Sequence, residues 1–224
     1  MVREFTVHEL WFLVLAVRWT IALSVIALVA GGAGGLVVAL SRVSRSAVPA
    51  GLAMAYIKVV QGTPLLMQLY LVYFGASLLR VTSDAWTAAA IGLALYASAF
   101  LGEIWRGCIQ AVPRAQWEAA RALGLGYPAQ LRFIVLPQAS RIALPPTVGF
   151  LVQLVKGTSL ASIIGFTELT RAAAVVNNAT FRPLMVYTAV AGLYFALCWP
   201  LSLLSERLER RLERAGATTV SFQI

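Results

Sequence analysis

Residues 118–137 read EAARALGLGYPAQLRFIVLP and lie between apolar segments of the chain. Residues 114–123 are nearly all good helix formers, and Gly124 follows them where a left-handed C′ residue would end a helix. Pro128 suits the first position of a second short helix, which we expect to end just before Pro137. The stretch therefore predicts two short helices held at a membrane surface between two membrane spans.

Small side chains gather at the end of the first short helix. Ala119, Ala120, Ala122 and Gly124 are predicted to leave a shallow socket that another protein could fill. The alternative is an amphipathic re-entrant helix with no partner. A docking socket is the interpretation that we prefer.

The composition indicates a membrane protein. Hydrophobic residues make up 60% of the 224 residues, charged residues make up 12%, and the mean hydropathy is +0.80. A soluble domain of this length cannot bury so much apolar surface. The net charge of +9 comes largely from arginines at span ends and in loops, which fits the positive-inside rule and not a nucleic-acid-binding face.

Cysteine and histidine usage predicts neither a disulfide nor a metal site. Cys108 and Cys198 are far apart in the sequence, and His8 alone cannot build a metal centre. The first apolar run has the length of a membrane span and is followed by Arg42 and Arg45, as in a stop-transfer segment. We therefore expect no cleavable signal peptide.

The chain is predicted to be one all-α transmembrane domain over residues 1–224. Five apolar segments are long enough to cross a hydrocarbon core of about 30 Å, at about 20–40, 52–79, 86–105, 146–164 and 184–204. Residues 106–145 form the loop that holds the two short helices.

Smaller features are expected around these spans. Residues 5–18 form an amphipathic stretch in the interface, and residues 167–183 form a polar link. The glycine-rich run 31–35 lets another helix approach closely. Glu103 and Arg106 can form a structural pair near the end of the third span, and Glu206 and Arg210 have i,i+4 spacing on a closing charged helix, which we interpret as a solvated face.

The second span is interrupted at Gly62-Thr63-Pro64. Pro64 removes one helical hydrogen bond, and Gly62 loosens the helix just before it. Backbone groups freed at membrane depth are tolerated only where protein or a water-filled cavity receives them. The interruption therefore predicts either a site in a cavity or a packing kink, and the sequence leaves both open.

Five spans place the two termini on opposite sides of the membrane. With the N-terminus outside, the larger group of arginines is cytoplasmic, namely Arg42, Arg45, Arg106, Arg114, Arg121, Arg132, Arg141, Arg207, Arg210, Arg211 and Arg214. The smaller group is then outside, namely Arg3, Arg18, Arg80, Arg171 and Arg182, while Lys58 and Lys156 remain in spans. The positive-inside rule therefore places the 106–145 loop in the cytoplasm.

Four further stretches complete a family pattern. They are Gly-Thr-Pro-Leu-Leu at 62–66 followed by Gln68, Glu-Ile-Trp-Arg-Gly at 103–107, Gln-Trp-Glu-Ala-Ala-Arg at 116–121 and Lys-x-Thr-Ser-Leu at 156–160. Together with Gly124, Ile134, Leu136 and Pro137, they resemble the permease subunits of ABC-type importers of polar amino acids (the histidine, glutamine, glutamate, arginine and opine subfamily). The match covers about residues 50–175.

The resemblance implies a type I ABC importer permease fold with two cytoplasmic coupling helices in a bacterial inner membrane. It assigns the contact with an ATPase to Trp117, Glu118, Ala119, Ala120, Arg121 and Gly124. The chain has no Gly-x-x-x-x-Gly-Lys-[Ser/Thr] phosphate loop, so ATP and Mg²⁺ are expected on a partner and this subunit is not expected to be an enzyme. The implied partners are a second permease subunit, identical or homologous, two ATP-binding cassette ATPases and a soluble periplasmic binding protein, all surrounded by membrane lipid.

A site for an amino acid is predicted around Lys156. The carboxylate of a zwitterion needs a cation and hydrogen-bond donors, and a lysine near the midplane costs about 2.5–3.5 kcal/mol unless it meets a wet cavity or a counter-charge. The hydroxyls of Thr158 and Ser159 and the backbone at Gly62, Thr63 and Pro64 could complete a carboxylate cradle. The alternative is that Lys156 only snorkels or ties two helices together.

Several positions depart from the family pattern. Gly157 stands where an acidic residue commonly follows the lysine, Phe150 stands where a polar residue is common, and Lys58 and Gln61 replace a Glu and an Arg that flank the kink. Our hypothesis is that this subunit favours acidic or neutral cargo or is the weaker half of a heterodimer.

Other classes of protein are less consistent with the sequence. A secondary amino acid transporter or a channel that works without ATP would not need the 118–137 pattern, and Glu103 is the one intramembrane carboxylate that we identify for proton coupling. A membrane enzyme has few catalytic groups available. A structural assembly subunit remains an alternative if the cavity at Lys156 is sealed.

Overall fold

The computed structural model describes residues 4–78 and 84–220, and Arg3 and Arg80 lie outside this part. Within it every regular element is helical. The elements are α1 (Val7–Arg42), α2 (Ala47–Gly62), α3 (Leu65–Leu78), α4 (Ala85–Gln110), α5 (Arg114–Ala122), α6 (Tyr127–Ala129), the π-helical segment η1 (Gln130–Val135), α7 (Leu136–Gly157), the 3-10 segment η2 (Thr158–Ser162), α8 (Leu169–Thr180) and α9 (Pro183–Val220).

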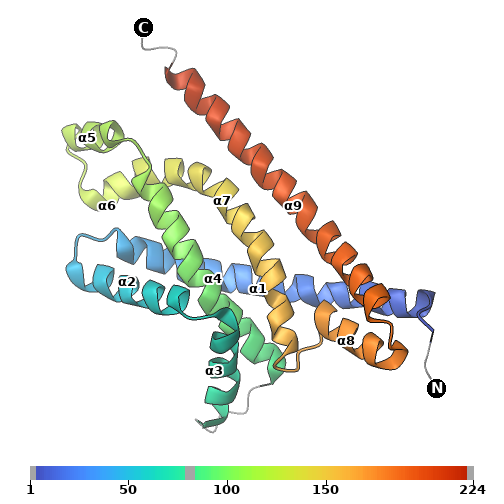
Figure 1. The fold of residues 1–224 in the computed structure, drawn as a ribbon. Helices are drawn as coiled ribbons and strands as arrows, with labels where there is room; N and C mark the ends of the chain where they lie inside the picture. Colours follow the sequence, from blue (N-terminus) through green and yellow to red (C-terminus); the bar gives the residue numbers. More distant parts are fainter. Residues whose placement is uncertain (1–3, 79–83, 221–224) are drawn as a thin grey trace.

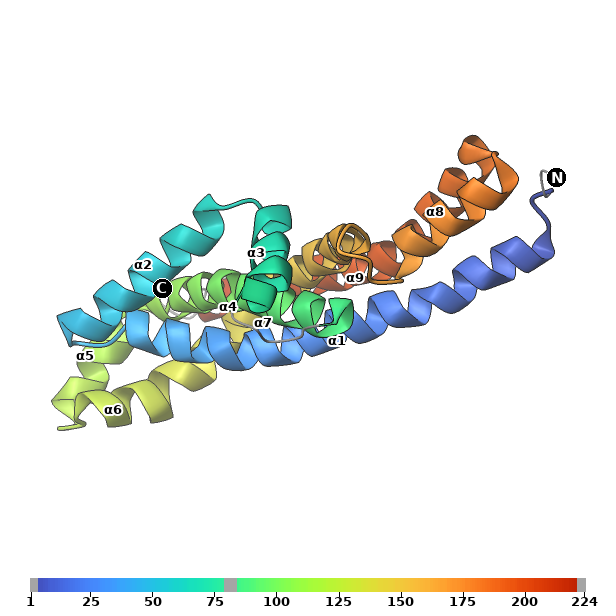
Figure 2. The ribbon, with the colours of Figure 1, turned by 90° about the horizontal axis from the view of Figure 1, so that it is seen from below.

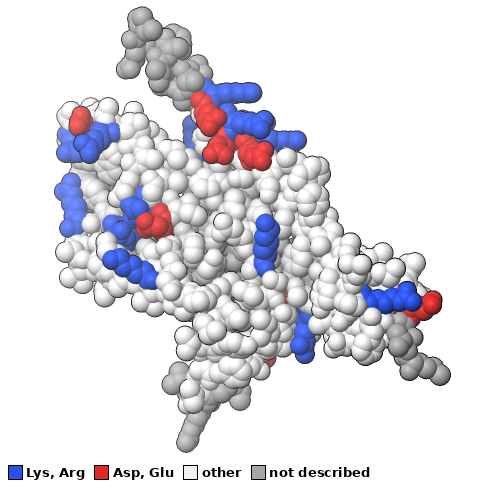
Figure 3. Space-filling model, in the orientation of Figure 1, with Lys and Arg blue, Asp and Glu red and all other residues white. Residues whose placement is uncertain are grey.

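The helices form an elongated body with distinct ends (Figures 1 and 2). The short helices α5 and α6 lie at one end, near which the C-terminal part of α9 also lies. Helix α8 and the N-terminal end of α1 lie at the other end, so the two termini are far apart. Most charged side chains on this face gather over the end with α5 and over the C-terminal part of α9, and much of the remaining face is uncharged (Figure 3).

The membrane class is confirmed, and the predicted spans correspond to α1, the α2–α3 pair, α4, α7 and α9. In the described part, α1, α4 and α9 are long and apolar enough to cross a membrane, and α2 with α3 adds a fourth span if the bent pair is counted as one. Helix α7 does not qualify by length and composition alone, although it packs between α4 and α9. The crossing of the membrane by α7 stays a prediction.

The first helix is longer than the sequence predicted. Residues 5–18 do not form a separate interfacial stretch, because α1 continues without a break from Val7 to Arg42. A capping box starts it, in which the Thr6 hydroxyl accepts from the backbone N–H of His8 and the Glu9 carboxylate accepts from the backbone N–H of Thr6 at 3.0 Å. Thirty-six residues measure about 54 Å, so α1 must cross a 30 Å core at a tilt or extend beyond it.

The second half of the chain needs four corrections. The second short helix does not end before Pro137, because η1 leads directly into α7, and Pro137 sits in the first turn of α7, where a missing N–H costs little. The helix that contains the predicted fourth span, α7, therefore starts at Leu136, ten residues before that span. The predicted polar link contains the helix α8, and the last span and the closing charged helix are one helix, α9.

Two predicted ion pairs are present. The Arg106 Nε atom donates to Glu103 Oε2 at 2.8 Å, and Arg210 lies 3.8 Å from Glu206. The second pair is exposed and contributes little stability.

Glycines set the close packing of α1 against α4, as the 31–35 run predicted. A Cβ atom on Gly31 would lie 2.5 Å from Ala97 Cβ, and a Cβ atom on Gly102 would lie 2.5 Å from Val38 Cγ1. Both distances are too short for any side chain, so the two helices meet here with their backbones close together. The central core forms around this contact, with Leu23, Ala27, Leu93, Ala97 and Leu101 fully buried.

This packing predicts the effect of a single methyl group. Gly31→Ala should lower the melting temperature of the purified protein in detergent, because the new Cβ meets Ala97 Cβ at 2.5 Å and the Ala94 carbonyl at 2.9 Å. Overpacking of this kind typically costs about 1–3 kcal/mol. The matched control is Gly192→Ala in α9, where nothing lies within 4 Å of the new atom. Equal melting temperatures for the two variants would contradict the packing described here.

Candidate functional site

The first short helix ends as the sequence predicted. Gly124 has a φ of +74°, and its backbone N–H donates to the Arg121 carbonyl at 2.9 Å. The N–H of Leu125 donates to the Ala120 carbonyl at 3.2 Å. These two bonds form a Schellman motif, so Gly124 is the left-handed residue that turns the chain out of α5.

The exposed face of α5 differs from the predicted socket. Ala120 is only 2% exposed, so it packs inward and cannot contact a partner directly. Trp117 also turns inward, and its ring stacks on Tyr127 with centroids 6.0 Å apart. Glu118, Ala119 and Arg121 are exposed, and Leu123 next to them is 78% exposed. The surface is therefore a charged ridge with an apolar tip, and Leu123 is an exposed apolar residue of this ridge that the sequence reading did not include.

The segment after α5 is tied to the ends of the long helices. The Tyr127 hydroxyl donates to the Val43 carbonyl at the end of α1, and the Arg45 guanidinium lies 4.6 Å from the centre of the Tyr127 ring. The buried Gln130 donates to the Leu125 carbonyl at 2.5 Å. A small apolar core below joins the ends of α4 and α7 and consists of Ile109, Val112, Val135 and Ala139. A displacement of α5 would therefore be passed to α1, α4 and α7.

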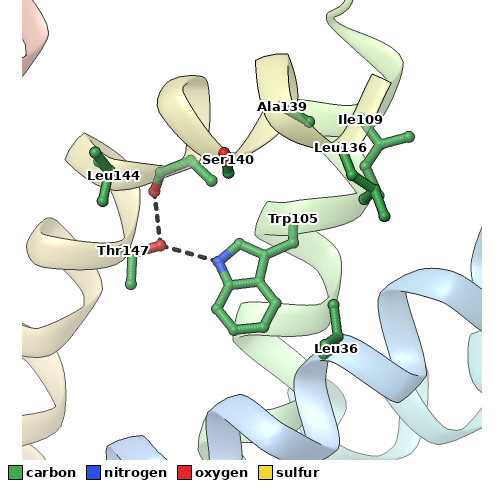
Figure 4. A pocket seen from close by; sticks show the side chains of 9 residues that line it. Leu36, Trp105, Ile109, Leu136, Ala139, Ser140, Leu144 and Thr147 are labelled. Atoms are coloured by element: carbon green, nitrogen blue, oxygen red, sulfur yellow. Dashed lines mark hydrogen bonds between the residues drawn. The ribbon is translucent and has the colours of Figure 1, made fainter. Parts of the chain in front are cut away.

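An apolar pocket of about 410 Å³ lies beside this core, between α1, α4 and α7 (Figure 4). The Trp105 indole N–H donates to the Thr147 hydroxyl at 2.9 Å, and that hydroxyl donates to the Ala143 carbonyl at 2.6 Å. The other lining residues are Leu36, Ile109, Leu136, Ala139, Ser140 and Leu144. Because no lining side chain is charged, this pocket does not suit an amino acid zwitterion.

The interruption at 62–64 is a sharp turn. The helix axis bends by 104° between α2 and α3. The side-chain amide of Gln68 donates to the Val60 carbonyl at 2.7 Å and to the Thr63 carbonyl at 2.9 Å, while the Thr63 hydroxyl donates to the Val59 carbonyl at 2.7 Å. Protein side chains therefore receive the backbone groups that the break frees. The sequence pattern contained Gln68 but gave no indication of this role.

The break at 62–64 lies next to the C-terminal end of α7. A Cβ atom on Gly157 would lie 3.1 Å from Leu65 Cδ2, so the residue that follows Pro64 packs against the turn after Lys156. Gly62 and Pro64 are exposed in this chain, and so is Lys156. Within the described residues, Lys156 forms no ion pair, so it does not tie two helices together by charge.

The two hydroxyls of the predicted cradle differ in accessibility. Thr158 is fully buried, and its hydroxyl donates to the Val155 carbonyl at 2.7 Å, so it does not face a solute in this structure. Ser159 is half-buried, and its hydroxyl donates to the Lys156 carbonyl at 2.7 Å. Binding of a solute by Lys156, Ser159 and the 62–64 break stays a prediction.

The fold explains why the apolar Phe150 stands where the family pattern commonly has a polar residue. Its ring is 4% exposed and stacks on Phe100 with centroids 5.7 Å apart. Phe150 therefore belongs to the core between α4 and α7 and not to a cavity wall.

A second polar cluster lies at the start of α8, and the sequence reading missed it. Glu168 is fully buried and caps α8, and the Tyr194 hydroxyl donates to its carboxylate at 2.9 Å. Burial raises the pKa of the Glu168 carboxyl above its usual range. The available signal was an acidic residue directly before the alanine-rich segment 169–180, which fits an N-cap.

The fold and the exposed α5 ridge define a helical membrane subunit of a transport system. Residues 31–214 match the family described as the binding-protein-dependent transport system inner membrane component, and the chain belongs to this family.

Relatives and solved structures agree with this assignment. The chain is 36% identical over 200 residues to the probable amino-acid ABC transporter permease protein YckA of Bacillus subtilis, covering 89% of this chain and 88% of the relative. It is 33% identical over 200 residues to the glutamine transport system permease protein GlnP of Escherichia coli (strain K12), covering 88% and 90%.

Among solved structures, an amino acid ABC transporter crystallised with histidines matches with a TM-score of 0.87 and 34% identity, covering 94% of this chain and all of that one. The MetNI methionine ABC transporter matches with a TM-score of 0.80 at 21% identity, covering 92% of this chain and 99% of that one, which supports the fold alone. The predicted type I ABC importer permease fold is confirmed.

The break between α2 and α3 generates a prediction about stability. Gln68→Leu should lower the melting temperature in detergent, because it leaves the Val60 and Thr63 carbonyls without their donor. An unsatisfied buried polar group costs about 1–3 kcal/mol. Gln61→Leu is the matched control, since Gln61 is exposed on the other side of the break. An unchanged melting temperature for Gln68→Leu would show that other groups satisfy these carbonyls.

Proposed function

We propose that this chain is the permease subunit of an ATP-driven importer that passes a polar amino acid across the bacterial inner membrane. The observation that carries the proposal is the α5 ridge, which is exposed and yet fixed to the end of α1 through Tyr127 and to the ends of α4 and α7 through the small apolar core at Ile109 and Ala139. Such a joint suits a partner that pushes on α5 and thereby moves the helices. The names of the relatives, which are permeases of amino acid ABC transporters, support the cargo class.

The proposed assembly needs partners for the tasks that this chain is not equipped to perform. Two ATP-binding cassette ATPases would bind ATP and Mg²⁺, and one of them would dock on α5 of this chain at Glu118, Ala119, Arg121 and Leu123. A second permease subunit, identical or homologous, would complete the pathway through the membrane. A soluble periplasmic binding protein would deliver the amino acid from outside.

The proposed orientation has the N-terminus outside and the C-terminus in the cytoplasm. The basic side chains of α5 and the segment that follows it, Arg114, Arg121 and Arg132, then lie on the cytoplasmic side, in accord with the positive-inside rule. The wide separation of the two termini supports an odd number of crossings (Figure 1). This orientation brings the α5 ridge to the side where ATP is available.

The docking proposal is tested with proteoliposomes that contain the permease, its ATPase partner and the binding protein. The wild type should take up a labelled amino acid only when ATP is present on the side of the membrane where the ATPase binds. Gly124→Asp should abolish both ATPase co-purification and uptake, because a residue with a side chain is strained at a φ of +74° and the turn after α5 would change. Melting temperature reports whether the variant is folded.

Gly126→Asp is the matched control for this experiment. Gly126 lies two residues further on, has a φ of −65° and is exposed, so an aspartate meets no backbone strain there. Loss of the ATPase only with the Gly124 variant supports docking at α5. Wild-type uptake that continues without any ATPase would instead favour an ATP-independent secondary transporter or channel.

The predicted solute site is tested at Lys156. Lys156→Gln should reduce amino acid uptake by about tenfold or more, because it removes the cation that would pair with the cargo carboxylate. The ATPase should still co-purify, since Lys156 lies at the opposite end of α7 from the α5 segment. Lys58→Gln is the control, because Lys58 is likewise an exposed lysine on a helix of the spans. Equal uptake by both variants would remove Lys156 from the solute site.

A further inference from the structure

Glu168 is buried in an unusual way. The residue has no exposed surface, and fully buried glutamates are rare unless they are paired with a cation. The partners of its carboxylate are neutral, namely the backbone N–H groups of Thr170 and Arg171, each at 2.9 Å, and the Tyr194 hydroxyl at 2.9 Å. Among the described residues no lysine or arginine forms an ion pair with it. A fully buried carboxylate without a cation depends on these hydrogen bonds, because an unsatisfied buried charge is costly.

The hydrogen bonds around Glu168 join several separate elements. Leu169, the next residue, donates its backbone N–H to the Thr20 hydroxyl of α1 at 3.2 Å. The hydroxyls of Thr170 and of Tyr194 in α9 lie within hydrogen-bond distance at 2.9 Å, and α8 packs against η2, which begins at the buried Thr158. One buried cluster therefore connects α1, η2, α8 and α9 at the end of the molecule where α8 lies (Figure 1).

The cluster lies next to the turn that carries the predicted solute residues. Thr158 is the neighbour of Ser159 and lies two residues after Lys156. Helix α9 also packs against the residue before this turn, because Val155 and Cys198 belong to one buried cluster against which Tyr194 packs. The turn 156–159 is thus held by the part of α9 that Tyr194 joins to Glu168.

The chemistry of the carboxylate suits this linking role better than an amide would. An ionised carboxylate offers about four acceptor positions, so it can accept two backbone N–H groups and a phenolic O–H together. A glutamine has the same shape, but half of its head group is an NH₂ donor that cannot accept from the α8 backbone. Exchange of Glu168 for glutamine therefore changes the bonding and leaves the packing volume almost unaltered.

We propose that Glu168 is a positioning residue of the transport cycle. Its carboxylate bonds the first turn of α8 to Tyr194 and thereby fixes the 156–159 turn, which carries Lys156 and Ser159, relative to α1 and α9. This inference rests on the proposed import function, but it assigns a role to a residue that contacts neither the cargo nor the ATPase.

Protonation of Glu168 should make its positioning role visible in the pH dependence of uptake. The groups that face its carboxylate cluster are Thr20 of α1, Thr158 of η2 and Tyr194 of α9, with Thr170 and Arg171 on its own helix. Of these side chains, Tyr194 and Arg171 are the titratable ones. Burial raises the pKa of Glu168, so protonation begins at a higher pH than for an exposed glutamate. Uptake by the wild type should fall as the pH is lowered through this raised pKa, because the protonated group loses acceptor positions.

The experiment measures ATP-driven uptake by the reconstituted complex between pH 5 and 8, with the ATP hydrolysis rate measured alongside. Glu168→Gln should lower the maximal uptake rate by about tenfold, the loss expected for one charge-assisted hydrogen bond, and should flatten its pH dependence. The concentration of loaded binding protein at half-maximal uptake should not change. Glu168→Asp should recover part of the rate. Glu206→Gln is the control, since this exposed carboxylate on α9 makes only a 3.8 Å pair.

The outcomes separate this inference from the proposed function. Absence of ATP-driven uptake by the wild type would contradict the proposed function itself. If the wild type shows ATP-driven uptake and Glu168→Gln has the same uptake rate and pH profile, the positioning role is overturned. Should the glutamine variant fail to assemble, Tyr194→Phe decides, because it keeps the carboxylate and removes one bond. An unchanged rate and pH profile for Tyr194→Phe would then overturn the proposal.

Discussion

The close contact between α1 and α4 is the constraint on which the rest of the structure depends. Gly31 and Gly102 allow two backbones to meet at a distance that no other residue permits, and the central core is built on both sides of this contact. Since α1 and α4 end near each other, they also provide the base to which the α5 segment is attached. Because the hydrophobic effect does not drive helices together within lipid, close packing of this kind is a main source of their association.

A second constraint is the need to satisfy every backbone polar group away from water. The chain meets it differently at three interruptions. Gln68 supplies the missing donors where α2 turns into α3, Gly124 allows a Schellman motif at the end of α5, and the Glu168 carboxylate caps the first turn of α8. At each interruption protein groups receive the freed backbone groups, which is the condition on which irregular backbone is tolerated at membrane depth.

Much of the fold could be predicted because the signals were local. Gly124 ended α5 in the left-handed conformation as expected, and the glycine run of α1 marked the helix contact. The errors arose where a local signal was overruled. Pro137 looked like a helix end, yet it sits in the first turn of α7, where proline is tolerated. The inward rotation of Ala120 followed from the stacking of Trp117 on Tyr127, which sequence spacing does not reveal.

The amino-acid sequence by itself determined the membrane class, the positions of the breaks and the family to which the chain belongs, because these depend on composition and on short motifs with fixed spacing. Only the tertiary structure decided which motif residues are accessible. Thr158 belongs to the predicted solute motif, but it is buried against the cluster of Glu168 and Tyr194, residues that lie ten and thirty-six positions further along the chain. Such a cluster has no sequence signature, because its members come from helices that meet only after the chain has folded.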